Sequence, residues 1–333
     1  MSGNWRLTQT LTYVFPLIVL IAAWLVIASI NPRFAGINSI FGIVQGFGLV
    51  GLVALGLSVT IIAGELDLSV GSMAALTAVI AILCAPLGTL AAIVLPTLVG
   101  ITLGMAQGAA IGWLRISSLA FTIGTLIMLR GLAYLASGHA PITVPNELIG
   151  VTDPLIARYK LLGVNVATLG SLVALVVFIL TGLFLTYTRW GREIHAIGGA
   201  RNEAIAAGVP LIRPMALAFA FSAGCASLAG VMAALRGATA APQNYEDLLL
   251  SGAAAALLGG ISLYGGRGTV LNVALGVGIL SVISAGLAPL GTPVSVIQLV
   301  TGGLLLSVVG LEYLFGRLLA GRSSLGRRLF NPD

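Results

Sequence analysis

The sequence predicts an all-α integral membrane protein with about ten transmembrane helices, and three observations support this class. Of the 333 residues, 58% are hydrophobic and only 8% are charged, whereas soluble domains are about half apolar and roughly a quarter charged. The mean hydropathy is +1.10. Apolar runs of about 20 residues, the length at which a helix crosses the bilayer core, recur along the whole chain.

Ten apolar segments are the candidate spans. A segment in lipid must satisfy its own backbone hydrogen bonds, which at this composition requires helices. The second and third spans, and the eighth and ninth, are short and meet at glycine-rich turns, so broken or re-entrant segments are expected there. The expected spans cover residues 11–30, 45–63, 70–87, 89–113, 117–137, 166–188, 213–235, 248–265, 268–288 and 293–315.

The basic residues set the orientation. No small-residue cleavage site follows the first span, so we expect an uncleaved helix with a cytoplasmic N-terminus. Alternation then puts eleven basic residues inside and four outside, as the positive-inside rule requires, and both termini in the cytoplasm. The inner set is Arg6, Arg115, Arg189, Arg192, Arg201, Arg213, Arg267, Arg317, Arg322, Arg327 and Arg328; the outer set is Arg33, Arg158, Lys160 and Arg236. Arg130 lies in the fifth span, where it either snorkels to the interface or belongs to an ion site.

Several kinds of chemistry are excluded or disfavoured. Cys84 and Cys225 lie in apolar runs and offer neither a disulfide framework nor a metal-ligand spacing. The only lysine, Lys160, does not follow a glycine-rich loop, so there is no GxxxxGK[ST] nucleotide site. His139 and His195 fall in loops, so no span offers a base to activate a serine. We therefore expect no catalytic residue, no metal site, no cofactor bound by this chain and no nucleic-acid partner.

The stretch GELDLSVGS, residues 64–72, places Glu65 and Asp67 between two apolar segments. Asp67 precedes the third span, where a carboxylate can accept from free helix-end amides and face the positive end of the helix dipole. Ser69 and Ser72 can add hydrogen bonds in the same turn. Three roles remain open: a helix cap, a gate or contact with a partner subunit, and a direct solute ligand. The loosely similar stretch GGISLYGGRGT, residues 259–269, hints at an internal repeat.

The longest internal loop covers residues 189–212 and contains a segment of good helix formers that ends at Gly208. A short exposed helix that is anchored by spans at both ends can transmit rigid-body motion from a partner. The charges of Arg192, Arg201 and Glu203 suit a polar, reversible interface. The alternative is that these charges only set the topology.

Three ordered motifs resemble the permease subunits of sugar-type ABC importers, the ribose, xylose, galactose and autoinducer-2 group. The loop GREIHAIGGARNEAIAAGVP is similar to the pattern GR-x-x-x-A-x-GG-N-x-x-A-A-x-x-x-G-I, from which it departs by an inserted-looking "AR" before Asn202 and by Val209. GELDLSVGS is similar to GGIDLSVGS, with Glu65 replacing the second glycine. LLGGISLYGGRGTV is close to VLGGTSLAGGRG. The loop matches the pattern at Gly191, Arg192, Ala196, Gly198, Gly199, Ala204, Ala207 and Gly208.

The resemblance covers nearly the whole chain and implies one permease domain, residues 1–333, with a fold like that of the cobalamin importer (type II-like) in a bacterial plasma (inner) membrane. It implies a cytoplasmic ABC ATPase, which uses ATP and Mg and docks on the coupling loop 189–212. It also implies a periplasmic or extracellular sugar-binding protein and a second permease copy or paralogue. The residues implied for coupling are Gly191, Arg192, Gly198, Gly199, Glu203, Ala204 and Gly208; those for a helix cap or gate are Glu65, Asp67, Ser69 and Ser72.

The leading hypothesis is a permease subunit that moves a monosaccharide or similar polar solute inward, powered by a separate ATPase. A neutral sugar needs no buried countercharge, which suits spans that carry amides and hydroxyls. The alternative is a self-contained secondary carrier or channel, and a membrane-embedded enzyme is a third, less favoured reading. Each candidate pathway side chain can equally serve helix packing; the candidates are Gln45, Gln107, Thr122, Thr125 and Gln298.

Overall fold

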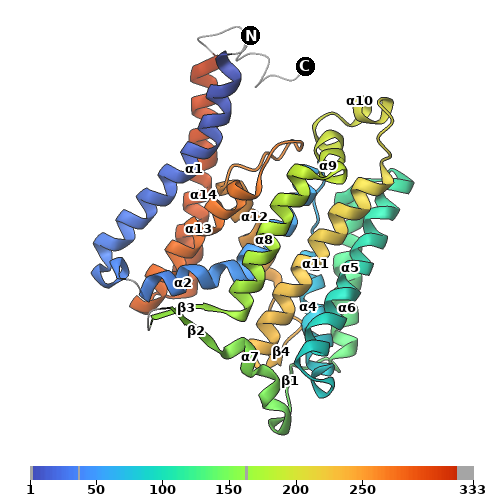
Figure 1. The fold of residues 1–333 in the computed structure, drawn as a ribbon, viewed down its shortest axis with the longest axis vertical. Coiled ribbons are helices and arrows are strands. Elements are labelled where there is room, and N and C mark those ends of the chain that lie inside the picture. Colours follow the sequence, from blue (N-terminus) through green and yellow to red (C-terminus); the bar gives the residue numbers. More distant parts are fainter. Residues whose placement is uncertain (1–2, 37, 162–163, 321–333) are drawn as a thin grey trace. The chain divides into compact units, whose positions relative to one another are not determined.

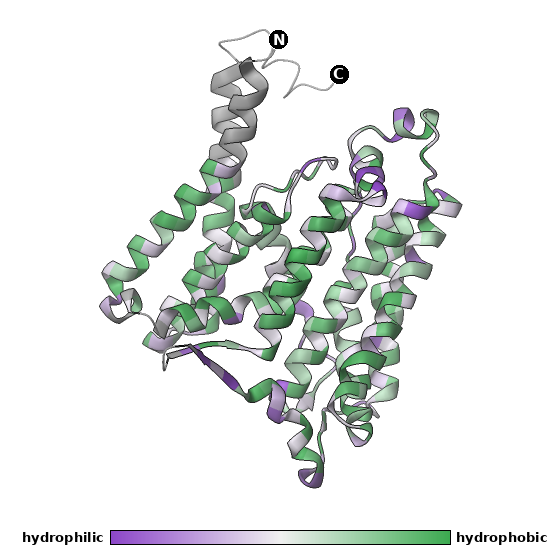
Figure 2. Cartoon of the chain, viewed as in Figure 1, coloured by the Kyte–Doolittle hydropathy of each residue, from purple (hydrophilic) through white to green (hydrophobic). Residues whose placement is uncertain are grey.

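The computed structural model describes residues 3–36, 38–161 and 164–320, and this part of the chain is mostly helical. Seven of its helices are long and apolar enough to cross a membrane. Figure 2 shows hydrophobic residues along the lengths of these helices and hydrophilic ones gathered mainly in the connections. The seven candidate spans are Tyr13–Ile30, Ser39–Ile62, Thr89–Leu114, Ser118–Ala136, Leu169–Tyr187, Ile212–Gly237 and Val270–Leu290. The prediction of an all-α membrane protein is therefore confirmed in its coarse form.

Helices lie in all ten predicted segments, but three segments hold shorter apolar stretches. α4 covers Val70–Leu83, and α12 covers Glu246–Leu258. α14 runs over Val294–Ala320 and carries the apolar stretch Val294–Val308. The long elements are α1 (Gly3–Ile30), α2 (Asn38–Gly46), η2 (Phe47–Gly51), α3 (Leu52–Ile62), α5 (Thr89–Leu114), α6 (Ser118–Ala136), α8 (Leu169–Tyr187), α11 (Ile212–Gly237) and α13 (Val270–Leu287).

Three predicted boundaries are wrong. The second span starts at Ser39 instead of residue 45, because α2 continues through the π-helical turn Phe47–Gly51 into α3. The third span ends at Leu83, before a 3₁₀ turn at Ala85–Leu87. The eighth ends at Leu258 because Gly260, with a φ of +89°, turns the chain out of the helix.

Short elements fill the connections, and the strands among them were not predicted. β1 (Ile142–Thr143) pairs antiparallel with β4 (Thr239–Ala240), and β2 (Arg158–Leu161) pairs with β3 (Val164–Thr168). The other short elements are the helices α7 (Asp153–Ile156), α9 (Arg189–Gly199) and α10 (Arg201–Ala206), and the 3₁₀ turns Pro32–Ala35, Asn146–Thr152 and Ala288–Leu290.

The chain divides into two compact units, residues 1–286 and 287–333. The first unit contains the candidate site described below, and the described part of the second includes the turn Ala288–Leu290 and α14. The predicted arginine-rich tail, with Arg322, Arg327 and Arg328, lies outside the described residues.

α11 is the centre of the first unit and packs against α3, α4 and α5. The contact with α5 depends on a row of glycines spaced four residues apart. A Cβ on Gly104 would lie 2.5 Å from the Phe219 carbonyl oxygen, and one on Gly108 would lie 2.3 Å from that of Met215. Apolar side chains gain little by leaving lipid for a protein interior, so helix association in a membrane depends on such close backbone approach.

The two ends of the first unit differ in their elements (Figure 1). α9 and α10 lie at one end, and β1, β4 and α7 lie at the other. This arrangement groups the loop 189–212 with the α3–α4 and α12–α13 turns. The segments expected to be external, among them 138–161 and 236–245, meet at the opposite end through the β1–β4 pair. The grouping matches the predicted alternation of loops.

Candidate functional site

The turn between α3 and α4, residues 63–69, is a junction of several segments. The Leu66 amide donates to the Ser118 hydroxyl at the start of α6 at 3.4 Å, and the Thr122 hydroxyl donates back to the Leu66 carbonyl at 3.5 Å. Gly64 lies against Gly198 of α9 and against Gly265 of the α12–α13 loop. The turn therefore contacts both the coupling loop and the second glycine-rich turn.

Asp67 is the central polar group of this turn, and its side chain is 1% exposed. Its Oδ1 accepts from the Ser69 amide at 3.0 Å, the Ser69 hydroxyl at 2.6 Å and the Gln107 amide at 3.4 Å. Its Oδ2 accepts from the Ser222 hydroxyl at 2.8 Å. A buried carboxyl group is strongly destabilising unless its oxygens accept hydrogen bonds. Here α5 and α11 each supply one of the donors, Gln107 and Ser222.

The Asp67 bonds extend beyond a local helix cap. The residue that precedes α4 is Ser69, and its side chain makes no capping hydrogen bond to that helix. Asp67 accepts from the Ser69 amide, so it stabilises the turn just before the helix begins. We refer to Asp67, Ser69, Gln107 and Ser222 as the Asp67 cluster, which joins the turn to two long helices. Ser72 is buried nearby, and its hydroxyl has no hydrogen-bond partner within the described residues.

Glu65 forms an ion pair with Arg201, whose Nη2 contacts the Glu65 Oε1. The Glu65 side chain is only 9% exposed, whereas that of Arg201 is 41% exposed. Both residues stand where the sequence departs from the importer pattern, since Glu65 replaces a glycine and Arg201 belongs to the inserted-looking pair. The two departures therefore meet in space and tie the α3–α4 turn to the start of α10.

Gly198 is the closest backbone contact of this junction. A Cβ on Gly198 would lie 1.8 Å from the Ile62 carbonyl oxygen, so no other residue fits without movement of the backbone. The same Ile62 oxygen accepts from the Gly266 amide at 2.8 Å. Three motifs, distant in sequence, thus share a single carbonyl group at the end of α3, and we call this contact the glycine junction.

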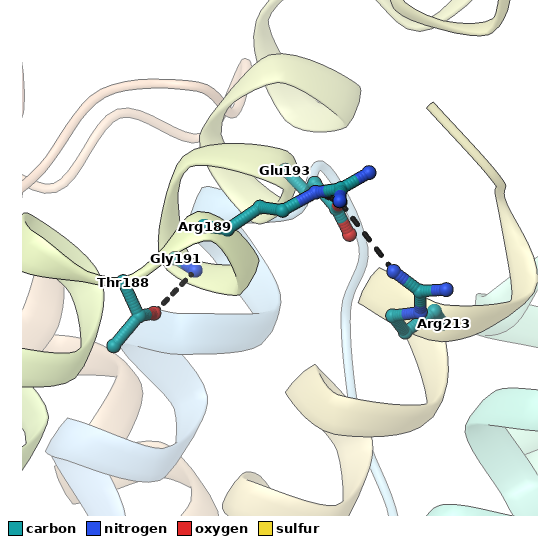
Figure 3. A network of polar contacts seen from close by, with 5 residues as sticks. All are labelled: Thr188, Arg189, Gly191, Glu193 and Arg213. Carbon is teal, nitrogen blue, oxygen red and sulfur yellow. Dashed lines mark hydrogen bonds and ion pairs between the residues drawn. The ribbon is translucent and has the colours of Figure 1, made fainter. Parts of the chain in front are cut away.

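The base of the coupling loop is held by a second polar network (Figure 3). The Thr188 hydroxyl accepts from the Gly191 amide at 3.0 Å and caps α9. Arg189 Nε lies 2.9 Å from the Glu193 Oε1, and Arg213 Nη1 lies 3.6 Å from the same oxygen. Glu193 is 6% exposed. This network fixes α9 to the first turn of α11.

The other residues implied for coupling are spread over α9 and α10. Arg192 is exposed on α9, and Glu203 is exposed in the first turn of α10. Ala204 is buried. Gly208 has a φ of +89° and follows the last turn of α10, as its role as a helix stop predicted. Gly199 ends α9, and a Cβ added to Gly199 would make only ordinary contact with Gly266, at 3.6 Å from its Cα.

The candidate pathway side chains do not gather in one place. Gln107 belongs to the Asp67 cluster, whereas Gln45 accepts from Thr168 at 3.0 Å and from Arg236 at 3.2 Å at the opposite end. Thr125 hydrogen-bonds within α6. Gln298 is exposed on α14.

Sequence reasoning missed several partners. Ser222, Glu193 and Arg213 were not singled out, because nothing in a linear pattern pairs α11 with the α3–α4 turn or with α9. Arg130 pairs with Glu246 at 2.7 Å. Neither earlier alternative for Arg130 included this partner, which lies at the start of α12.

These features define a multi-pass membrane protein in which the loop 189–212 is packed onto the turns beside two short helices, α4 and α12, an arrangement suited to a transport permease. The comparison with known families agrees. The chain belongs to the family described as branched-chain amino acid transport system / permease component, which matches residues 39–309. The resemblance drawn from the three motifs is thereby confirmed, and so is the multi-pass membrane location.

The individual relatives are permeases of L-arabinose and autoinducer 2 importers. The chain is 33% identical to the autoinducer 2 import system permease protein LsrD of Enterobacter sp. (strain 638), over 93% of each chain. It is 30% identical to the L-arabinose ABC transporter permease protein AraH of Azospirillum brasilense, over 92% of this chain and 88% of that protein. LsrD of Escherichia coli (strain K12) is 30% identical over 84% of this chain and 86% of its own. No solved structure matches the chain.

Proposed function

We propose that this chain is the translocation subunit of an ATP-driven importer for a neutral solute the size of a monosaccharide. A separate ATPase hydrolyses ATP with Mg and docks on residues 189–212. A substrate-binding protein delivers the solute at the opposite end, and a second permease copy or paralogue completes the pathway. The chain acts as one permease domain with ten membrane segments, a type II-like fold and both termini in the cytoplasm.

The observation that carries this proposal is the glycine junction. α9 touches both the end of α3 and the loop before α13 through backbone contacts, with a 2.8 Å hydrogen bond from Gly266 to Ile62 between the two turns. Packed backbones have little freedom to deform, so a push on α9 moves both turns together. Docking of an ATPase on the coupling loop then changes the position of the membrane segments directly.

Two short helices supply the parts that move. α4 has 14 residues and α12 has 13, which correspond to about 20 Å of helix against a hydrocarbon core of about 30 Å. Each therefore crosses only part of the membrane, and the turns Gly64–Ser69 and Gly259–Thr269 complete the crossing inside protein. Irregular backbone at such depth is tolerated where protein or a polar cavity surrounds it. The Asp67 cluster makes the first turn move as one piece with α5 and α11.

The solute is proposed to be neutral because six helices contain no Asp, Glu, Lys, Arg or His: α2, α3, α4, α5, α8 and α13. A charged solute, or a coupling ion, normally requires charged partners inside the bundle. The names of the relatives also favour a small sugar-like solute, since one is an L-arabinose permease and others belong to autoinducer 2 import systems.

Reconstitution tests the proposal. The chain is placed in vesicles with and without its ATPase and binding protein, and uptake is measured for L-arabinose, a panel of neutral sugars and leucine. We expect uptake of a neutral sugar only with the ATPase, and none with an ATPase variant that cannot hydrolyse ATP. Rapid uptake by the chain alone would establish the carrier or channel alternative. Preference for leucine would overturn the substrate class and leave the ATP-driven mechanism standing.

A further inference from the structure

A cavity of about 370 Å³ lies beside the coupling loop, outside the glycine junction. Its walls come from the last two turns of α8, from α9 and from the start of α13. The polar lining consists of Thr186, Arg192, His195 and Thr269, and Leu185 and Val270 supply apolar walls. No acidic side chain is among the lining residues. We call this cavity the α8–α9 pocket.

The level of the pocket in the membrane follows from its neighbours. Tyr187 at the end of α8 is 75% exposed, and Trp190 at the start of α9 is 48% exposed. Exposed Tyr and Trp side chains concentrate at the headgroup level of a bilayer. One to two turns deeper on α8, Leu180 and Leu183 are exposed aliphatic residues. The pocket therefore opens where lipid headgroups lie, above a helix face suited to acyl chains.

The charges of the pocket favour an anion. Arg192 is exposed, and its only described contact, with the Tyr187 carbonyl, is long at 3.4 Å. The neighbouring acid, Glu193, is already engaged by Arg189 and Arg213. The His195 Nδ1 lies 2.9 Å from the Gly191 carbonyl, and its Nε2 lies 3.4 Å from that of Gly268. The His195 ring is therefore held at the wall of the pocket by these two backbone carbonyls.

The start of α13 adds amide dipoles on the far wall. The backbone N–H of Asn272 donates to the Thr269 hydroxyl at 3.4 Å, which places Thr269 at the N-cap of that 18-residue helix. The positive end of the α13 dipole thus faces the same cavity as Arg192, and helix N-termini attract phosphate groups.

We propose that the α8–α9 pocket binds the phosphate of an anionic phospholipid in the cytoplasmic leaflet, with Arg192 as the main charged contact and Thr186 as a hydroxyl donor. The inference rests on the orientation given under the proposed function. Basic pockets between helices on the cytoplasmic side are suited to anionic headgroups. The headgroup would bridge the end of α8 to α13 and so link the coupling loop to the surrounding lipid.

Quenching of tryptophan fluorescence tests this proposal. The full chain has four tryptophans. Trp5, Trp24 and Trp113 are replaced by Phe, so that Trp190 reports on the pocket. The protein is reconstituted in bilayers that contain brominated phosphatidylglycerol or brominated phosphatidylcholine at equal fraction. In a matched protein only Trp113 is kept, at the end of α5 near Arg115, where a basic residue is present without a pocket.

We expect phosphatidylglycerol to be enriched over phosphatidylcholine at Trp190 and not at Trp113. Arg192→Gln should reduce the enrichment about fivefold, as removal of one basic contact at a membrane surface predicts. Thr186→Glu, at an exposed position, should abolish it and serves if Arg192→Gln fails to fold. The Arg115→Gln variant should change nothing at Trp190.

Three outcomes would overturn the proposal. Equal quenching by the two lipids at Trp190 would show that the pocket has no preference for an anionic headgroup. Displacement of the lipid by excess inorganic phosphate would identify a site for free phosphate instead. Unchanged enrichment in both variants, together with weaker binding of the ATPase, would show that the pocket belongs to the docking surface. None of these results depends on sugar uptake, so failure here is separable from failure of the proposed function.

Discussion

The two ends of the first unit are held together in different ways. At the coupling end, backbone meets backbone: Gly198 packs on the Ile62 carbonyl, and Gly266 donates to the same group. At the opposite end, the two-residue strands β1 and β4 pair, and single side-chain bonds such as Thr239 to Ile142 at 3.1 Å complete the contact. At Gly198 the first end has no room for a side chain, whereas the second end combines a short backbone pairing with single side-chain bonds.

This difference follows from what each end is proposed to do. An end that transmits motion from an ATPase must be stiff, and close backbone contact between glycines gives stiffness without flexible side chains. An end that receives a binding protein and opens to solute requires contacts that can break at small cost. A single hydrogen bond from a partly buried side chain, such as that of Thr239, contributes only about 1 kcal/mol of net stability, because water can replace it. Substitutions at each end test this difference, because they should affect stability and uptake strongly at the coupling end and weakly at the opposite end.

Gly198→Ala should have the largest effect. The new methyl group would lie 1.8 Å from the Ile62 oxygen, so the junction must separate, at a cost of about 3 kcal/mol in stability, the upper end of what overpacking usually costs. We expect a clear fall in the melting temperature of the purified protein and loss of ATP-driven uptake. Gly199→Ala is the matched control, since its nearest neighbour is the Gly266 Cα at 3.6 Å. Equal effects of the two variants on melting temperature and uptake would show that close packing at Gly198 is not what the protein requires.

The Asp67 cluster should give the next largest effect. Asp67→Asn replaces one acceptor oxygen with an NH₂ group that cannot accept from the Ser69 or Ser222 hydroxyl, and a buried polar group left unsatisfied costs about 1–3 kcal/mol. Ser222→Ala should destabilise the protein by a similar amount, because it leaves Oδ2 with one donor fewer. We expect both variants to insert into the membrane, melt at lower temperature and transport slowly.

Ser58→Ala is the control for the cluster, because the buried Ser58 hydroxyl bonds only to the Ala54 carbonyl of its own helix. Failure of Asp67→Asn to insert would instead make Asp67 chiefly a determinant of folding. If Asp67→Asn and Ser222→Ala melted and transported like Ser58→Ala, the Asp67 cluster would have no part in the coupling mechanism.

Much of the fold could be predicted from the sequence, because lipid leaves few options for an apolar chain. The apolar segments correspond to helices, and the loops fall at the expected ends. The errors lie where local signals and packing disagree. The π turn Phe47–Gly51 joins α2 to α3, so this span begins at Ser39 and not at the predicted residue 45. α12 is shorter than its apolar run because Gly259 and Gly260 end it.

The site was only half accessible to sequence reasoning. The glycine-rich turns and the loop 189–212 were found because their motifs are local. Their convergence on Ile62 was not, since a contact between residues 62, 198 and 266 has no signature in any one segment. The Glu65–Arg201 pair is an intermediate case: two departures from one family pattern were visible, and their opposite charges were the available clue that they meet.

The Glu65–Arg201 pair offers a smaller test of the coupling end. Arg201→Gln leaves a nearly buried carboxylate without its partner, whereas Glu65→Gln leaves an arginine that reaches solvent. We therefore expect Arg201→Gln to be the more destabilising variant and the double variant to resemble Glu65→Gln. The coupling energy from the double-mutant cycle should be about 1 kcal/mol, because Arg201 is partly exposed. Additive effects in melting measurements would show that the two side chains act independently.

Thr239→Val should have the smallest effect, because it removes one side-chain bond from the opposite end. The Val144 amide still donates to the Ala238 carbonyl at 2.9 Å, so the strands stay paired without the Thr239 hydroxyl. Valine also suits a strand, and the loss of stability should be about 0.5 kcal/mol. Melting temperature and ATP-driven uptake should both stay close to those of the unaltered protein. If Thr239→Val instead matched Ser222→Ala in either measurement, a single side-chain bond would matter as much at the opposite end as in the Asp67 cluster. The contrast between the two ends would then not hold.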